Sequence, residues 1–182
     1  EIDRWILSLL NTLVKEVDEH YNSYEPTRAG RAISDFVNDN LSNWYVRLNR
    51  KRFWGGEMNE DKLSAYQTLY TCLETVALLM APIAPFFSDR LFTDLTTATG
   101  RADKSVHLCN FPTLHEEIID KELEERMHIA QDITSMVLAL RRKVNIKVRQ
   151  PLTTLMIPIL DEYQKEHIEA VQELILNEVN VK

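Results

Sequence analysis

Apolar residues recur at spacings of three and four along most of the 182-residue chain, which is the pattern of amphipathic helices. Four glycines and six prolines are too few for a protein built from many tight turns. The pattern therefore predicts a mainly α fold, a bundle of four to five helices. A chain of this length buries roughly 70% of its unfolded surface, so such a core needs no disulfide or metal to fold.

Glycine, proline and asparagine mark the breaks between the expected helices. We expect helices over residues 2–21, 27–52 (with Thr27 as N-cap), 60–80 and 116–143, and a shorter helix that follows Pro82 and Pro85 and ends near Leu95. Gly55 and Gly56 end the second helix, and Asn145 caps the last. Residues 96–113 are expected to form a loop with an extended piece at Val106–Cys109.

The pattern changes after Asn145. Pro151 disfavours helix at Gln150, and residues 152–160 read as a β-strand. Residues 163–176 return to helical spacing, and residues 178–181 alternate like a strand. The sequence thus predicts a helical bundle over residues 1–145. A linker and the start of a truncated α/β subdomain are expected over residues 146–182.

Positive charge is concentrated in two stretches of an otherwise acidic chain. The formal net charge is −7, yet residues 41–56 and 133–160 contain no Asp or Glu. The first basic island consists of Arg47, Arg50, Lys51 and Arg52, and the second of Arg141, Arg142, Lys143, Lys147 and Arg149. Such a chain is a poor general binder of polyanions, but it suits one specific polyanion on one face.

The first island lies on a helix with two distinct faces. One face is apolar (Val37, Leu41, Trp44, Tyr45 and Leu48), and the other carries Asn40, Asn43, Arg47, Arg50 and Trp54. Amide and guanidinium groups hydrogen-bond bases and phosphates, and an indole ring stacks on a splayed base. A solvated helix face also explains the charges, and a core anchor at the helix end also explains Trp54. Trp44 is expected in the core.

The second island has a simple electrostatic explanation for part of its charge. Basic residues at the end of a helix interact favourably with its dipole, which accounts for Arg141–Lys143 without any ligand. Lys147 and Arg149 alternate in an extended segment and point the same way, which the dipole does not explain. Single-stranded RNA loops are recognised by such combinations of positive charge, amides and exposed aromatic rings.

The sequence carries no recognisable catalytic set. There is no glycine-rich phosphate loop, and the five histidines lack metal-ligand spacing, so we expect no catalytic residue, metal or cofactor in this chain. Cys72 fits a core position, and the absence of a CxxC spacing favours a reducing compartment. Without a leader or a membrane span, a cytoplasmic location is expected. We also expect a monomer. The first residue is not Met, which suggests a piece of a longer protein.

Four runs of residues together resemble a known family. They are Asp39–Arg47 continuing through Arg50–Trp54, then Met80–Phe86, then Val106–Leu108 before Phe111-Pro112, and then Val148–Leu152. In this order they closely resemble the anticodon-binding helical bundle of isoleucyl-tRNA synthetases, which are class I aminoacyl-tRNA synthetases. The resemblance spans essentially the whole chain. The valine and leucine enzymes share the Ala-Pro-Phe and Pro-Leu landmarks more loosely.

The resemblance implies a role in holding tRNA. Enzymes of this family use ATP and Mg to attach isoleucine to tRNA(Ile), in a catalytic domain of the same polypeptide whose HIGH and KMSKS motifs do not occur here. We expect Asn43, Arg47, Arg50, Lys51, Arg52 and Trp54 to meet the anticodon loop, and Arg141, Arg142, Lys147 and Arg149 to meet the stem backbone. The two islands would then form one cradle. Alternatives are the equivalent module of a valine, leucine or methionine enzyme, or a helical protein-interaction domain.

Overall fold

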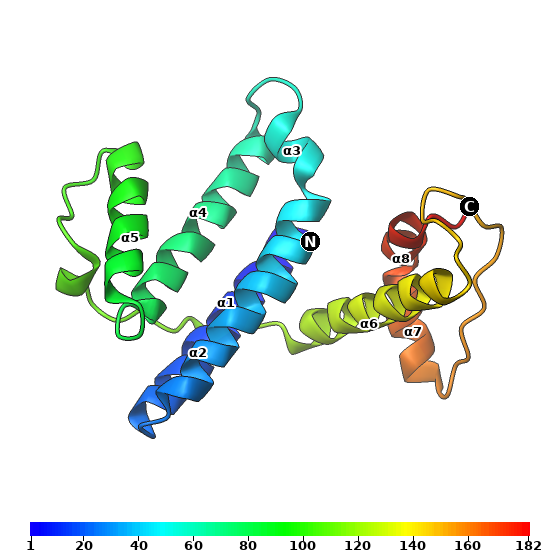
Figure 1. Ribbon diagram of the computed structural model, residues 1–182, viewed down its shortest axis with the longest axis horizontal. Helices are drawn as coiled ribbons and strands as arrows, with labels where there is room; N and C mark the ends of the chain where they lie inside the picture. The colour runs from blue at the N-terminus through cyan, green and yellow to red at the C-terminus, as the bar shows by residue number, and fades with distance from the viewer. The chain divides into compact units, whose positions relative to one another are not determined.

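The computed structural model describes residues 1–182, and the chain divides into two compact units (Figure 1). Unit 1 is Glu1–Ile119 and unit 2 is Asp120–Lys182. The division falls after residue 119 rather than at the expected 145/146 position, because α6 (Lys121–Lys143) packs against α7 (Glu162–Ala170) and α8 (Gln172–Val179). Where the domains of a longer polypeptide begin and end stays a prediction.

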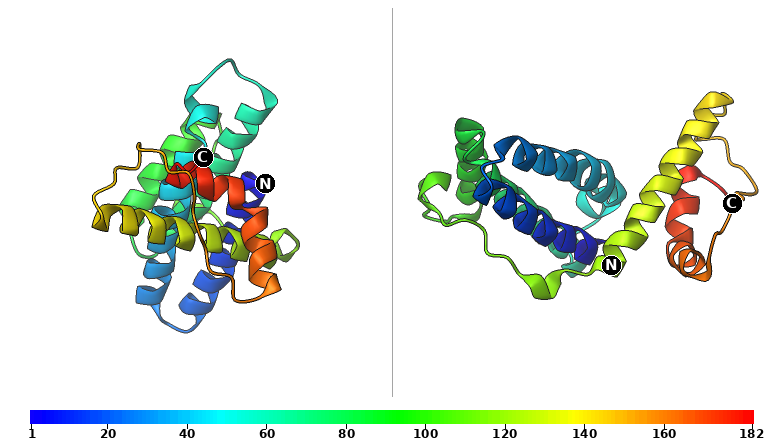
Figure 2. Two further views of the ribbon diagram at one scale, coloured as in Figure 1. Left: turned by 90° about the vertical axis from the view of Figure 1, so that its right-hand side faces the viewer. Right: turned by 90° about the horizontal axis from the view of Figure 1, so that it is seen from below.

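Unit 1 is built from helices joined by loops, as expected. Its elements are α1 (Ile2–Asn22), α2 (Pro26–Asp35), η1 (Phe36–Val46), α3 (Arg50–Trp54), α4 (Glu60–Met80), α5 (Pro85–Thr99), η2 (Val106–Leu108) and η3 (Glu116–Ile118). α1 packs against α2, η1 and α4, and α4 also packs against α5 (Figures 1 and 2). The predicted bounds of α1 and α4 are confirmed to within a residue, and the Asn59 side chain caps α4 by accepting from the Lys62 amide.

The buried residues of unit 1 form the core that the apolar spacing predicts. Trp5, Ile6 and Val17 of α1 are buried, as are Tyr45 of η1 and Cys72 of α4. Burial raises the pKa of the Cys72 thiol to about 12, so this cysteine is an unreactive core residue, as expected. The Tyr21 hydroxyl donates to the Leu79 carbonyl at 2.7 Å and ties the far end of α1 to α4.

The expected second helix is helical but changes type along its length. Pro26, at the first position of α2, replaces Thr27 as the helix start, because a proline there loses no hydrogen bond. Residues 36–46 form a π-helix, η1, which has more residues per turn than an α-helix. A turn at Asn49 then separates η1 from the five-residue α3. Faces calculated with α-helical spacing therefore only approximate the observed ones.

The extended piece predicted at Val106–Cys109 does not form. Val106–Leu108 forms the short 3-10 helix η2 instead. Asp89 of α5 accepts from the Ser105 hydroxyl (2.6 Å) and the Val106 amide (3.0 Å), and these hydrogen bonds lower its pKa. Val106 completes a small core with Ala77 and Phe92. The expected helix over 116–143 likewise begins as a 3-10 turn, η3, and α6 itself starts at Lys121.

Unit 2 consists of α6 with α7 and α8 packed against it (Figure 2). The two predicted strands do not form, and a single parallel bridge pairs Leu152 with Val181. A strand needs a partner along its length, and no second strand of the chain supplies one. Asn145, with φ 57°, ends α6 in the predicted cap: the Ile146 amide donates to the Arg141 carbonyl and the Asn145 amide to the Arg142 carbonyl.

Arg141 is an internal strut of unit 2 rather than a surface residue, since only 3% of it is exposed. Its Nη1 donates to the carbonyls of Lys147 and Gln150, and its Nη2 to those of Val179 and Asn180. The last two belong to the C-terminal end of α8, where carbonyls lack helical partners and the dipole favours a cation. Arg141 therefore joins the end of α6 to the end of α8.

Replacing Arg141 should destabilise unit 2. Arg141→Met leaves buried carbonyls unpaired, and we expect the free energy of unfolding to fall by roughly 2–4 kcal/mol. The measurement is amide hydrogen exchange along α6 and α8 of the 182-residue chain, where protection should fall by that free energy. Arg142→Met is the control, because the neighbouring Arg142 is exposed and its replacement should change stability by less than about 0.5 kcal/mol. Equal protection in both variants would contradict the structural role of Arg141 in joining α6 to α8.

Candidate nucleic-acid interface

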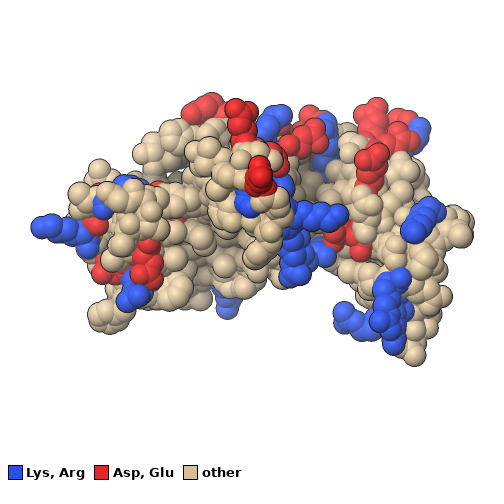
Figure 3. Space-filling view, turned by 90° about the horizontal axis from the view of Figure 1, so that it is seen from above, with Lys and Arg blue, Asp and Glu red and all other residues tan.

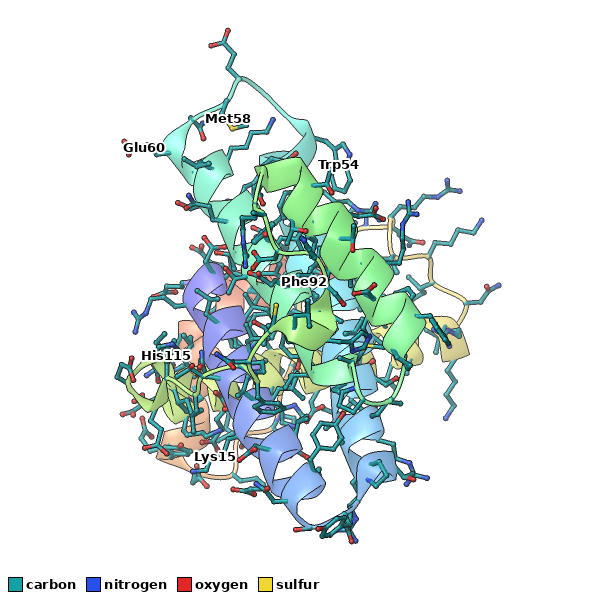
Figure 4. All side chains as sticks on the ribbon, turned by 90° about the vertical axis from the view of Figure 1, so that its left-hand side faces the viewer. Lys15, Trp54, Met58, Glu60, Phe92 and His115 are labelled. Atoms are coloured by element: carbon teal, nitrogen blue, oxygen red, sulfur yellow. The ribbon has the colours of Figure 1, made fainter.

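Most of the first basic island lies exposed at one end of unit 1. Asn43, Arg47, Arg50 and Lys51 are exposed, and Trp54 is 73% exposed. Trp44 is buried, which confirms its expected place in the core. The exposure of Trp54 shows that its explanation as a core anchor is wrong. Figure 4 shows Trp54 at the end of α3, beside the loop that leads through Met58 to Glu60. We call Arg50, Lys51 and Trp54 the α3 tip.

Arg47 lies one turn before the tip and is partly ordered by its neighbours. Its Nε donates to the Asn43 carbonyl at 2.7 Å, and its guanidinium lies 5.8 Å from the centre of the Trp44 ring. The side-chain amide of Asn43 is exposed on the same segment. Asn40, which the sequence placed on this face, is half-buried. The exposed residues that remain from this face carry an amide, three positive charges and an indole ring.

The loop after α3 is fixed by contacts that glycine permits. Gly55 donates to the Lys51 carbonyl, and a Cβ at Gly55 would lie 2.7 Å from that oxygen, so only glycine fits. Gly56 has φ +67°, a conformation that other residues rarely adopt. The Lys62 ammonium donates to both glycine carbonyls, and the Tyr66 hydroxyl donates to the Phe53 carbonyl. The α3 tip thus ends in an ordered turn against α4.

Arg52 does not belong to the exposed face, although it lies between Lys51 and Trp54 in sequence. Its side chain is 19% exposed and forms ion pairs with Asp3 of α1 and Asp61 of α4. Nη1 and Nη2 donate to the two Asp3 oxygens at 2.8 and 2.9 Å. Nε and Nη2 donate to the two Asp61 oxygens at 2.9 and 2.8 Å, and Nη1 also donates to Asn49 Oδ1 at 3.0 Å. This arrangement argues against Arg52 as an RNA contact.

Asp3 is the most enclosed carboxylate of this network. It accepts from Arg52 and from the Tyr45 hydroxyl, which lies 2.7 Å from Asp3 Oδ1. Burial alone would raise the pKa of Asp3, but the hydrogen bonds from Arg52 and Tyr45, with the charge of Arg52, outweigh it and lower the pKa. Burial and the bond to Asp3 raise the pKa of Tyr45. Asp3 is therefore ionised and paired at neutral pH.

The second basic island lies in unit 2, and the structure separates its members. Arg142, Lys147 and Arg149 are exposed, as is Lys143, whereas Arg141 is buried. The exposed residues lie at the end of α6 and in the loop that follows it. In unit 2, Lys and Arg side chains gather along one edge, and most acidic side chains lie elsewhere (Figure 3). This edge is a second candidate surface for phosphates.

The two islands belong to different compact units, so a single cradle formed by both stays a prediction. Within unit 1, Asn43 and Arg47 are exposed on the segment that leads into the α3 tip. The structure assigns internal contacts to Arg52 and Arg141, which the sequence had grouped with the surface residues. Sequence reasoning missed Asp3 and Asp61, the partners of Arg52. Asp61 lies 9 positions from Arg52 across the Gly-Gly turn, whereas Asp3 lies 49 positions away and gives no local signal.

The structure brings no three His, Cys, Asp or Glu side chains together as metal ligands. None of its helices combines the length and the apolarity needed to cross a bilayer. Asn43, Arg47 and the α3 tip offer charge, hydrogen-bond donors and one exposed indole ring, which are groups that bind nucleic acid.

The ion pairs of Asp3 should make unit 1 sensitive to acid. A carboxylate with a lowered pKa stabilises the fold above its unfolded pKa of 3.8, and this stabilisation disappears as the pH falls through the folded pKa. Asp3→Asn should therefore cost about 1 kcal/mol at pH 7, allowing for partial exposure, and the difference from the parent chain should shrink below pH ~4.

Urea unfolding followed by tryptophan fluorescence measures this effect, because Trp5, Trp44 and Trp54 all lie in unit 1. Asp18→Asn is the control on the same helix, since Asp18 is exposed, and it should change stability by less than about 0.5 kcal/mol. A cost for Asp3→Asn that is the same at pH 7 and pH 3 would contradict the assignment.

Comparison with known proteins shows which family the chain belongs to. The family model described as the anticodon-binding domain of tRNA ligase matches residues 3–157. Over its whole length the chain is 78% identical to an isoleucine–tRNA ligase of Bacteroides thetaiotaomicron, and it spans 16% of that protein. It is 67% identical to the corresponding ligase of Porphyromonas gingivalis (16% of its length) and 45% identical to that of Dehalococcoides mccartyi (18%). The chain belongs to the family of anticodon-binding domains of tRNA ligases.

Proposed function

We propose that this chain is the tRNA-binding module of an isoleucine–tRNA ligase and binds the anticodon stem-loop of tRNA(Ile). The observation that most supports this proposal is the α3 tip. It presents two exposed cations and an exposed indole at the end of a short helix, in a stretch without acidic residues. The family match and the relatives named isoleucine–tRNA ligase support the assignment. The exposed positive charges, amide and aromatic ring of this surface also favour binding of a single-stranded RNA loop.

In this proposal the exposed residues divide by chemistry. Arg47, Arg50 and Lys51 neutralise phosphates of the loop. Trp54 stacks on an unpaired base, and the amide of Asn43 hydrogen-bonds a base edge. Arg142, Lys147 and Arg149 of unit 2 contact the stem backbone. Arg52 and Arg141 are left out of this set, because both donate their hydrogen bonds to groups within the protein.

The rest of the reaction belongs to other parts of the polypeptide. The chain spans about a sixth of the length of the relatives it matches, 16% for the Bacteroides thetaiotaomicron protein. We propose that the polypeptide is a cytoplasmic monomer whose catalytic domain attaches isoleucine to tRNA with ATP and Mg. This chain then contributes binding and orientation of the tRNA, and the catalytic domain is its covalent partner.

Removing the charges of the α3 tip should weaken tRNA binding in a salt-dependent way. For Arg50→Gln/Lys51→Gln in the intact polypeptide, we expect weaker binding of tRNA(Ile). The slope of log affinity against log salt should become shallower by about 0.7–0.9 for each phosphate that the variant no longer neutralises. Affinities measured between about 50 and 200 mM salt give this slope, and circular dichroism should show unchanged helicity.

Arg90→Gln is the matched control, because Arg90 is an exposed arginine on α5, outside the proposed surface. It should leave the slope unchanged. If the double variant and the control bind alike, the α3 tip is not the interface. If the parent polypeptide binds valine, leucine or methionine tRNA better than tRNA(Ile), the module belongs to one of those ligases. Indifference to every tRNA at low salt would favour a protein-interaction domain.

Trp54 should contribute by stacking rather than by charge. Trp54→Ala should weaken tRNA binding by roughly 1–3 kcal/mol, with no change in salt slope, and Trp54→Phe should retain part of the affinity. Met58→Ala is the control, because Met58 is an exposed apolar residue without a ring in the loop that follows Trp54. Parental affinity for Trp54→Ala, measured at a fixed salt concentration, would remove Trp54 from the interface.

A further inference from the structure

Arg52 stands apart from the rest of its island. Arg50 and Lys51 are exposed, whereas the Arg52 guanidinium directs Nε, Nη1 and Nη2 at two carboxylates and an amide of its own protein. Nη2 also donates to the Asp61 backbone carbonyl at 2.9 Å. Its partners come from α1 and α4, which flank the short helix that carries Arg52. One side chain therefore joins three elements at the base of the α3 tip.

We propose that Arg52 is a positioning residue for RNA binding: it fixes the direction in which the α3 tip points, and it does not touch the RNA itself. This inference rests on the proposed tRNA interface. It assigns Asp3 and Asp61 a role in RNA binding as well, although both carry the charge that RNA repels.

The α3 tip needs an external anchor. α3 has 5 residues, and a helix of this length is not stable by itself. A turn at Asn49 precedes it and Gly55-Gly56 follows it, so α3 does not continue a longer helix on either side. Phe53 supplies the apolar anchor by packing edge-on against Tyr45 and Tyr66. Arg52 supplies the directional anchor, because a planar guanidinium with two bidentate partners permits one orientation.

The alternative is that Arg52 leaves its partners and pairs with a phosphate. That exchange abandons four hydrogen bonds to carboxylate oxygens and strands Asp3 and Asp61 near the RNA. Two hydrogen bonds to a phosphate do not compensate for this change. The two models predict opposite effects of removing one carboxylate. Freeing Arg52 strengthens binding if Arg52 contacts RNA, and it weakens binding if Arg52 positions the α3 tip.

Asp61→Asn in the intact polypeptide is the deciding variant. Asp61 is 67% exposed at its side chain, so the substitution keeps the fold while it removes one of the two negative charges that hold Arg52. We expect tRNA(Ile) affinity to fall roughly threefold to tenfold, with the salt slope of the parent, since the same cations still neutralise phosphates. Glu60→Gln is the matched control: it removes the same charge from the adjacent exposed position and should strengthen binding slightly.

A second variant guards against a general failure to fold. Arg52→Lys keeps the positive charge but removes the planar fork, so positioning predicts weaker binding at an unchanged salt slope. Near-parental affinity for Arg52→Lys, or stronger binding by Asp61→Asn than by Glu60→Gln, would overturn the proposal. Amide hydrogen exchange along α1 and α4 should match the parent in Asp61→Asn. In Arg52→Lys protection should persist, although it should be weaker near Asp3, and this persistence shows that the variant folds.

The experiments distinguish an error in the proposed interface from an error in the positioning role of Arg52. If Arg50→Gln/Lys51→Gln leaves the salt slope unchanged, the interface itself is wrong and the role of Arg52 falls with it. If the slope changes as expected while Asp61→Asn binds as tightly as Glu60→Gln, the interface stands and the positioning role is wrong.

Discussion

The bidentate contacts of Arg52 with Asp3 and Asp61 are the constraint on which the candidate RNA surface depends. They join the first helix, the short α3 and the start of α4, and they leave the neighbouring charges and Trp54 facing solvent. Unit 2 uses its basic island in the same way. Arg141 turns inward to the carbonyl ends of two segments, while Arg142 and Lys147 remain outside. In each unit one arginine of the basic island turns inward to protein groups, and its neighbours in the island stay exposed.

Much of the fold could be predicted from the sequence, because it depends on local patterns. The spacing of apolar residues predicted α1 and α4, and Asn59 and Asn145 cap helices as their side chains and backbone preferences suggest. The strands at 152–160 and 178–181 were wrong, because a strand depends on a partner that local sequence cannot report. The π-helical twist of η1 has no signal in the residue spacing either.

The candidate site was predicted less completely than the fold. Arg50 lies on the face away from the apolar stripe and is exposed, as that spacing predicts, whereas the spacing left Trp54 open to a core position that the structure does not give it. Arg52 and Arg141 resemble their neighbours in sequence, and only tertiary contacts distinguish them. The partners of Arg52 lie 49 and 9 positions away, and those of Arg141 up to 39 positions away. A charge pattern shows which stretch is basic, but the ion pairs decide which charges remain available to a ligand.

The most direct measurement of this account is a structure of the intact polypeptide with its tRNA bound. We expect Trp54 and the Arg50 and Lys51 side chains to contact the anticodon loop. Arg52 should still lie between Asp3 and Asp61, with the distances found here. A complex in which Arg52 has left both carboxylates for a phosphate, or in which the α3 tip stays in solvent away from the RNA, would contradict the central claim.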